Sequence, residues 1–119
     1  MKDSNNIELV EGDLVVLTID TPVEHPTELV IFLNIEEYVF NITEDGEERT
    51  EITKILHYYP LTKEGLQVAN YDAGVSQSTF HRQKKFTASN ICSKNLLKVS
   101  GDTLHGYTKT LFDEILALL

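Results

Sequence analysis

Residues 29–60 read LVIFLNIEEYVFNITEDGEERTEITKILHYYP, and this stretch decides the fold. Leu29–Leu33 is continuously apolar, which is typical of a strand with both faces buried and predicts a central position in a sheet. Tyr38–Ile42 alternates, so that Tyr38, Phe40 and Ile42 share one face of a strand. Asp45-Gly46 then predicts a tight hairpin turn, because a type I′ turn needs positive φ at both central residues.

The segment after this turn fits two periodicities. Alternate residues from Ile52 fit one face of a strand, whereas Ile52, Ile55 and Tyr59 fit the stripe of a helix. The Asp-Gly turn before the segment and the Tyr-Tyr-Pro sequence that ends it favour the strand. We therefore expect a hairpin whose second strand ends at Pro60.

The flanking sequence is less regular. Ile7–Val10 and Leu14–Ile19 are short apolar runs separated by Gly12, which predicts a tight hairpin of two strands. After Pro60 the pattern weakens, and three segments fit either short strands or short helices. These segments are Leu66–Tyr71, Phe80–Phe86 and Ile91–Val99.

The C-terminal stretch has the spacing of a helix. Asp102 is placed to cap the first turn, and Gly106 is a weak point after which the helix could begin. The apolar positions at helical spacing are Leu104, Tyr107, Leu111, Ile115 and Leu118. The predicted class is therefore α+β, an antiparallel sheet of about four to six strands with this helix packed on one face. The apolar surplus from Leu111 to Leu119 suggests, alternatively, a homodimer through the C-terminal helix.

Charge is distributed unevenly along the chain. The 119 residues predict one domain, residues 1–119, and carry a net charge of −9. Residues 1–51 hold fourteen acids and two bases, whereas no acid lies between Ala73 and Gly101. An acidic surface repels nucleic-acid phosphates and anionic lipids and attracts basic proteins, although such a charge can also simply keep a domain soluble. With no membrane-length apolar run and no leader-like start, we expect a cytoplasmic protein that binds neither nucleic acid nor membrane.

The sequence contains no motif that specifies catalysis, a metal or a cofactor. Its six glycines form no phosphate-binding loop, and its histidines lack the spacing of metal ligands. Phe80–Phe86 interleaves cations with aromatic residues as single-strand binders do, but we interpret it as a solvated edge. We expect no enzyme and no cofactor. A site formed only by folding would draw on four residues, His57, His81, Cys92 and His105.

Three classes of function remain. The leading hypothesis is an acidic interaction module, an inhibitor of the immunity or antitoxin type that neutralises a basic protein such as a nuclease toxin. Tyr58 and Tyr59 would add aromatic anchors if they were exposed. The alternatives are a self-associating structural component of a bacterial or viral complex, and a small-ligand binder or enzyme. The predicted partner-binding residues are Glu36, Glu37, Tyr38, Glu44, Asp45, Glu47, Glu48 and Glu51.

Overall fold

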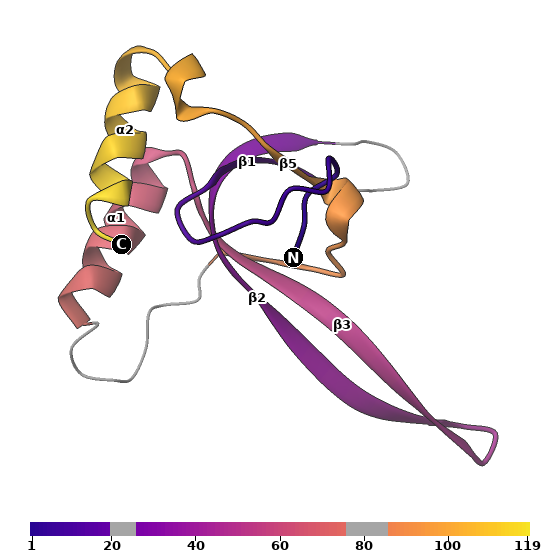
Figure 1. The fold of residues 1–119 in the computed structure, drawn as a ribbon. Helices are drawn as coiled ribbons and strands as arrows, with labels where there is room; N and C mark the ends of the chain where they lie inside the picture. Colours follow the sequence, from indigo (N-terminus) through magenta and orange to yellow (C-terminus); the bar gives the residue numbers. More distant parts are fainter. Residues whose placement is uncertain (20–25, 76–85) are drawn as a thin grey trace.

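The described part of the chain forms a five-stranded antiparallel sheet with two α-helices, which confirms the predicted α+β class (Figure 1). The computed structural model describes residues 1–19, 26–75 and 86–119. The strands lie side by side in the order β4-β3-β2-β1-β5. The elements are β1 (Leu14–Thr18), β2 (Thr27–Glu44), β3 (Glu47–Pro60), α1 (Lys63–Val75), β4 (Thr87–Ser89), η2 (Ser93–Asn95), β5 (Leu96–Lys98), η3 (Gly101–Thr103) and α2 (Gly106–Leu116).

The apolar run that predicted a central strand lies in the middle of the sheet. It belongs to β2, which pairs with β1 on one side and β3 on the other. Val30 and Ile31 are both fully buried although they point to opposite faces. Two apolar clusters therefore meet β2 from its two sides.

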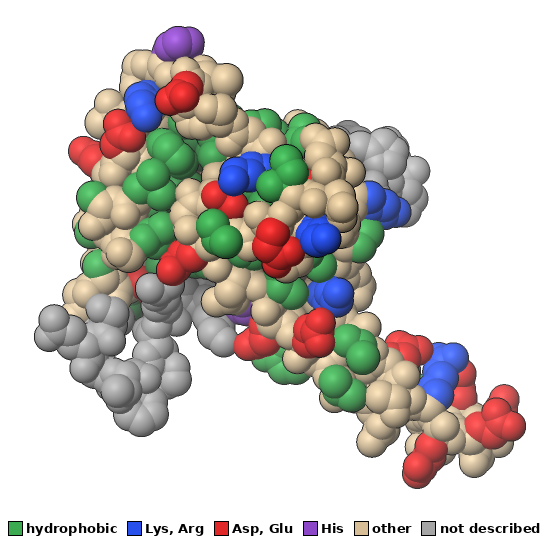
Figure 2. Space-filling model, in the orientation of Figure 1, with side chains coloured by type: hydrophobic (Ala, Val, Ile, Leu, Met, Phe, Trp, Pro, Cys, Tyr) green, Lys and Arg blue, Asp and Glu red, His purple; other side chains and the backbone are tan. Residues whose placement is uncertain are grey.

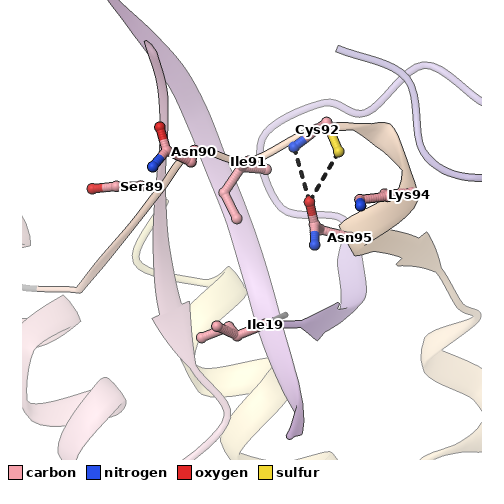
Figure 3. A pocket seen from close by; sticks show the side chains of 7 residues that line it. All are labelled: Ile19, Ser89, Asn90, Ile91, Cys92, Lys94 and Asn95. Atoms are coloured by element: carbon pink, nitrogen blue, oxygen red, sulfur yellow. Dashed lines mark hydrogen bonds between the residues drawn. The ribbon is translucent and has the colours of Figure 1, made fainter. Parts of the chain in front are cut away.

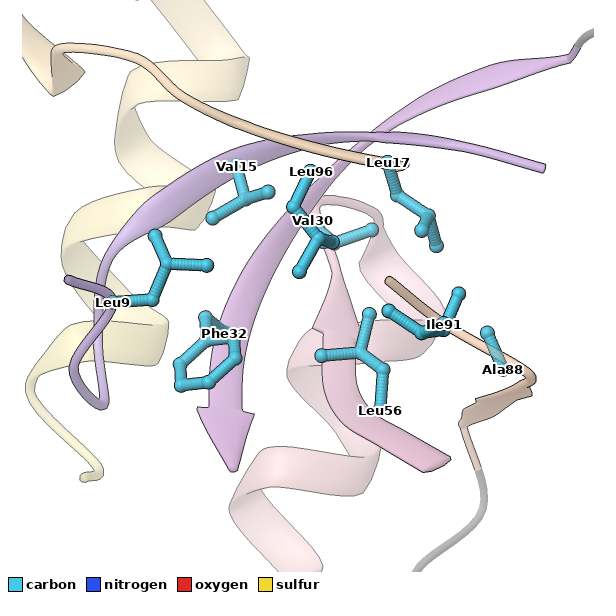
Figure 4. Close-up of a cluster of buried hydrophobic side chains, with 9 residues drawn as sticks. All are labelled: Leu9, Val15, Leu17, Val30, Phe32, Leu56, Ala88, Ile91 and Leu96. Carbon is cyan, nitrogen blue, oxygen red and sulfur yellow. The ribbon is translucent and has the colours of Figure 1, made fainter. Parts of the chain in front are cut away.

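The first cluster lies on the concave side of the curved sheet (Figure 4). The second lies between the sheet and the helices α1 and α2, which cover the other side (Figure 1). Leu111 and Ile115 of α2 are buried in this second cluster, as the helical spacing predicts, and Phe112 is buried beside them. Tyr107, which has the same spacing, is instead 64% exposed. None of the helices in the described residues is long and apolar enough to span a membrane.

The paired strands β2 and β3 continue far beyond the rest of the sheet. They pair as far as Glu44 and Glu47, but β1 pairs only with Thr27–Ile31 and β4 only with residues 55–57. We refer to residues 36–54 as the arm. The arm comprises nine residues of β2 and eight of β3. At about 3.3 Å per residue its length is about 30 Å. The radius of gyration is 16.2 Å, whereas a compact chain of this length would have about 13.5 Å.

The structure overturns one expectation near the N-terminus and decides an open one after Pro60. Ile7–Val10 forms no strand, because both edges of β1 are taken by β2 and β5. The N–H of Ile7 instead bonds to the Asp3 carboxylate. Leu66–Tyr71 belongs to the longer helix α1, whose first turn is capped by a hydrogen bond from Gly65 N–H to Thr62 Oγ1 (3.1 Å).

The start of the C-terminal helix also differs from expectation. Asp102 lies in the 3-10 turn η3 and does not cap α2, which begins at Gly106 after His105. The positive φ of Gly106 (61°) separates the two elements. Of Phe80–Phe86, only Phe86 lies within the described residues.

Candidate functional site: the protruding acidic arm

The hairpin turn at the tip of the arm follows directly from the sequence. Asp45 and Gly46 have φ values of 51° and 79°, as a type I′ turn requires. Below the turn, the Arg49 guanidinium contacts Glu51 (3.0 Å) and Glu44 (3.4 Å). Such exposed pairs contribute about 0–1 kcal/mol each, and a lone two-stranded hairpin is marginally stable. The hairpin of the arm is therefore only marginally stabilised by its own contacts.

Apolar side chains are exposed on both faces of the arm. Val39 and Ile52 lie directly opposite one another, on the side of the concave cluster. Tyr38 and Phe40 lie on the side of the helices. The exposed fractions are 50% for Tyr38, 63% for Val39, 43% for Phe40 and 60% for Ile52. Four large apolar side chains exposed on one hairpin are typical of an interaction surface rather than of scattered surface residues.

Acidic side chains crowd the tip of the arm (Figure 2). The arm holds seven acids and two bases, a net charge of −5. Four of the predicted binding residues, Glu44, Asp45, Glu47 and Glu48, come together around the turn. Glu37 lies nearer the body, where its carboxylate is 3.8 Å from Lys54 Nζ. The arm therefore carries acidic side chains together with exposed apolar residues on each of its two faces.

Glu36 stands apart from the other predicted residues. It is half-buried at the base of the arm, with Oε1 3.4 Å from Nε2 of His57. His57 is buried, and its Nδ1 has no hydrogen-bond partner among the described residues. Glu36 therefore lies at the base of the arm and is less exposed than the predicted residues nearer the tip.

Tyr58 and Tyr59 do not reach the surface as aromatic anchors. Tyr59 is buried, and its hydroxyl donates a hydrogen bond of 2.5 Å to Asp72 Oδ2 in α1. Tyr58 is half-buried against the concave cluster and Phe86. Burial, and then the charge of Glu28, raise the pKa of the Tyr58 hydroxyl above its usual value. Of Tyr38, Tyr58 and Tyr59, only Tyr38 is exposed on the arm as an aromatic anchor.

Two neighbouring hollows open at the base of the arm. One, of about 560 Å³, is lined by Glu37, by residues 52–54 of β3 and by residues 90–92. The other, of about 380 Å³, shares residues 90–92 and extends to Ile19, Ser89, Lys94 and Asn95 (Figure 3). Asn90 has a φ of +57°, which turns the chain away from β3 after β4.

The residues considered for an enzyme site are dispersed or outside the described chain. Cys92 is exposed in the hollows, where its Sγ donates to Asn95 Oδ1 (3.1 Å). His105 is exposed before α2, His57 lines neither hollow, and His81 lies outside the described residues. Within the described ranges, no group of three or more histidine, cysteine or acidic residues could hold a metal ion.

Sequence reasoning missed part of this surface. Val39 and Ile52 were not distinguished from core residues, because alternation predicts which side chains share a face but not whether anything covers that face. Comparison with family models, with curated proteins and with solved structures gave no match to this chain. The function is therefore inferred from the residues and their geometry.

Proposed function

We propose that the protein is an acidic interaction module whose arm docks onto a basic protein. One observation carries this proposal: the arm projects from the body and exposes four large apolar side chains within a strongly acidic surface. A folded chain gains nothing from extending such residues into water. Burial against a partner would remove them from water and would stabilise a weakly held hairpin.

Charge and apolar surface would have different roles in this binding. The arm's net charge of −5 would attract a basic partner and accelerate encounter, an effect that salt screens. The apolar side chains would supply most of the affinity after desolvation, with Tyr38 and Phe40 as aromatic anchors. An inhibitor that covers the basic substrate site of a nuclease toxin has this chemistry.

The arrangement of the arm favours a different protein over a second copy as the partner. Pairing two β2 strands antiparallel about Phe40 would place Glu36 of each copy opposite Glu44 of the other. Two arms of charge −5 would also repel one another. The apolar residues Leu111, Phe112 and Ile115 are already buried within the chain's own core. The self-associating alternative therefore receives less support than the inhibitor.

The test compares two variants that remove the same charge from different places. Glu47→Gln/Glu48→Gln neutralises the tip of the arm, and Asp113→Asn/Glu114→Gln neutralises two exposed acids of α2. The tagged wild-type protein and both variants would capture proteins from the native host at low salt, followed by a rising salt gradient. We expect a stoichiometric basic protein to bind the wild type and the α2 variant, and to leave the arm variant at clearly lower salt.

The salt dependence of the association rate provides a second measurement with the captured protein. Wild type and the α2 variant should show the same steep decrease in rate, and the arm variant a shallower one. If both variants behave alike, the net charge is responsible rather than the arm. In that case, or if only the chain itself elutes at every salt concentration, the proposal is wrong.

A further inference from the structure

The edge of β3 along the arm presents backbone groups that point away from β2. Glu44 and Glu47 flank the two-residue turn, so they form a hydrogen-bonded pair. The backbone N–H and C=O groups of the odd-numbered residues of β3 therefore point towards β2. The even-numbered residues face the opposite side. Two bonds near the body confirm this alternation, because Lys54 O accepts from Ile91 N (3.1 Å) and Tyr58 N donates to Phe86 O (3.2 Å).

The strand that begins to cover this edge leaves it at the base of the arm. Within the described residues, β4 pairs with β3 only over residues 55–57, and the chain turns away at Asn90. From Ile52 to Glu48 the outward N–H and C=O groups have no strand beside them among the described residues. The hollow of about 560 Å³ opens at the point where β4 departs. An added strand in line with β4 would therefore find both a free edge and space for its side chains.

The side chains beside this edge differ between the two faces. Ile52 lies on the concave side and lines the hollow together with Ile91. Glu47 and Glu51 lie on the other side, towards the helices. Arg49 lies between them on this face and is paired with Glu51 and Glu44, so the acids there outnumber the single base. Because successive side chains of a strand alternate between faces, an added strand with apolar and basic residues in alternation would complement both.

From these features we infer that an extended segment of the partner, alternating basic and apolar residues, adds as a strand to the β3 edge over Glu48–Ile52. Its backbone pairs with Glu48, Thr50 and Ile52, and an apolar side chain enters the hollow beside Ile52 and Ile91. Its lysines or arginines face Glu47 and Glu51. The inference rests on the proposed function and specifies how the arm would bind.

The probe is a short synthetic peptide that alternates lysine with valine, added to the full chain. Amide hydrogen exchange followed by NMR reports each strand position separately. In the free protein the amides of residues 49, 51 and 53 should be protected by β2, and those of residues 48, 50 and 52 should exchange quickly. Bound peptide should protect residues 48, 50 and 52. The control is the same peptide N-methylated at the alternate amides that would face β3. It should not bind, because it cannot donate hydrogen bonds to the outward carbonyls of β3.

Two proline variants at one level of the arm separate its two edges. Thr50→Pro removes an outward N–H from β3, whereas Asn41→Pro removes one from the opposite edge, on β2. Thr50 and Asn41 are cross-strand partners, and both changes lose the same side-chain hydrogen bond between them (3.1 Å). We expect Thr50→Pro to weaken peptide binding at least about tenfold and Asn41→Pro to change it less than about twofold.

Several outcomes would overturn strand addition at β3. These are equal effects of the two prolines, the reverse order of effects, unchanged binding of the N-methylated peptide, or no binding of the peptide at all. If Thr50→Pro unfolds the arm, the exchange pattern of the wild type decides. Equal proline effects together with a loss of binding in Glu47→Gln/Glu48→Gln would refute strand addition and leave the acidic docking arm standing.

Discussion

The exposed apolar residues of the arm contribute little to the folded state, and replacement of Ile52 tests this directly. Ile52 is 60% exposed, whereas Ile31, in the adjacent strand, is fully buried. Both are isoleucines in strands, and threonine retains the β-branched shape and a high strand propensity. Ile52→Thr and Ile31→Thr are therefore a matched pair that differs mainly in burial.

The expected magnitudes follow from these exposures. Full burial of an isoleucine stabilises the folded state by up to about 3 kcal/mol, so Ile52→Thr should cost at most about 1 kcal/mol. Ile31→Thr loses the whole burial and places a hydroxyl in the core, which should cost about 3 kcal/mol or more. For 119 residues, 1 kcal/mol corresponds to about 4 °C in Tm. We therefore expect Ile52→Thr to lower Tm by no more than about 4 °C and Ile31→Thr to lower it by at least about 12 °C.

Thermal unfolding followed by circular dichroism and calorimetry measures both decreases. If Ile52→Thr lowers Tm as much as Ile31→Thr, the arm is part of the cooperative core and its apolar residues are needed for folding. That result would remove the reason for assigning them to a partner. A small decrease for Ile52→Thr, with a large one for Ile31→Thr, would leave the arm's apolar surface free for binding.

The remaining predictions concern the body. Asp3 accepts N–H bonds from Lys98, Ile7 and Asn5 (2.9 Å each), and these hold the pKa of its carboxyl below the usual 3.8. The ionised Asp3 carboxylate therefore stabilises the folded state above pH 3.8, and this stabilisation is lost as the pH falls. Asp3→Asn should lower Tm at neutral pH and reduce the further fall of Tm on acidification. An unchanged fall of Tm at acid pH would contradict this explanation. Burial raises the pKa of Glu28 above 4.5, so the ionised form costs stability above that pH. Glu28→Gln should increase resistance to urea at neutral pH, and the gain should vanish below pH 4.5; equal effects at both pH values would refute this explanation. A Cβ at Gly65 would lie 2.0 Å from Pro60 O, whereas one at Gly74 meets no described atom within 4 Å. In calorimetry, Gly65→Ala should lower the free energy of unfolding by at least about 2 kcal/mol, whereas Gly74→Ala should leave it unchanged or raise it. Similar effects of the two changes would show that the close approach of Gly65 to Pro60 does not prevent a side chain there.

Local signals predicted the centre of the fold well. The apolar run Leu29–Leu33 became the buried part of β2, and Asp45-Gly46 formed the turn. Ile52–Tyr59, which also fitted a helix, is in β3. Here the turn chemistry determined the structure, because a tight hairpin places the next segment directly beside the preceding strand.

Weakly patterned segments could not be assigned in the same way. Ile7–Val10 has the composition of a strand but finds no free edge of β1 to pair with. Leu66–Tyr71 lies in α1, whose apolar stripe is short and interrupted by polar residues. For such segments, tertiary packing outweighs local preference.

The candidate site likewise combines features that the sequence predicted with features that depend on tertiary packing. The sequence by itself determined that acids gather around a hairpin turn and that Tyr38, Phe40 and Ile42 share a face. Only the tertiary structure decided that β1 and β4 cover the body of the hairpin and leave residues 36–54 without neighbouring strands among those described. The physical reason is that alternation and turn chemistry act between residues close in the chain. Exposure depends instead on where distant segments end, so the same pattern describes both a covered strand and a projecting arm.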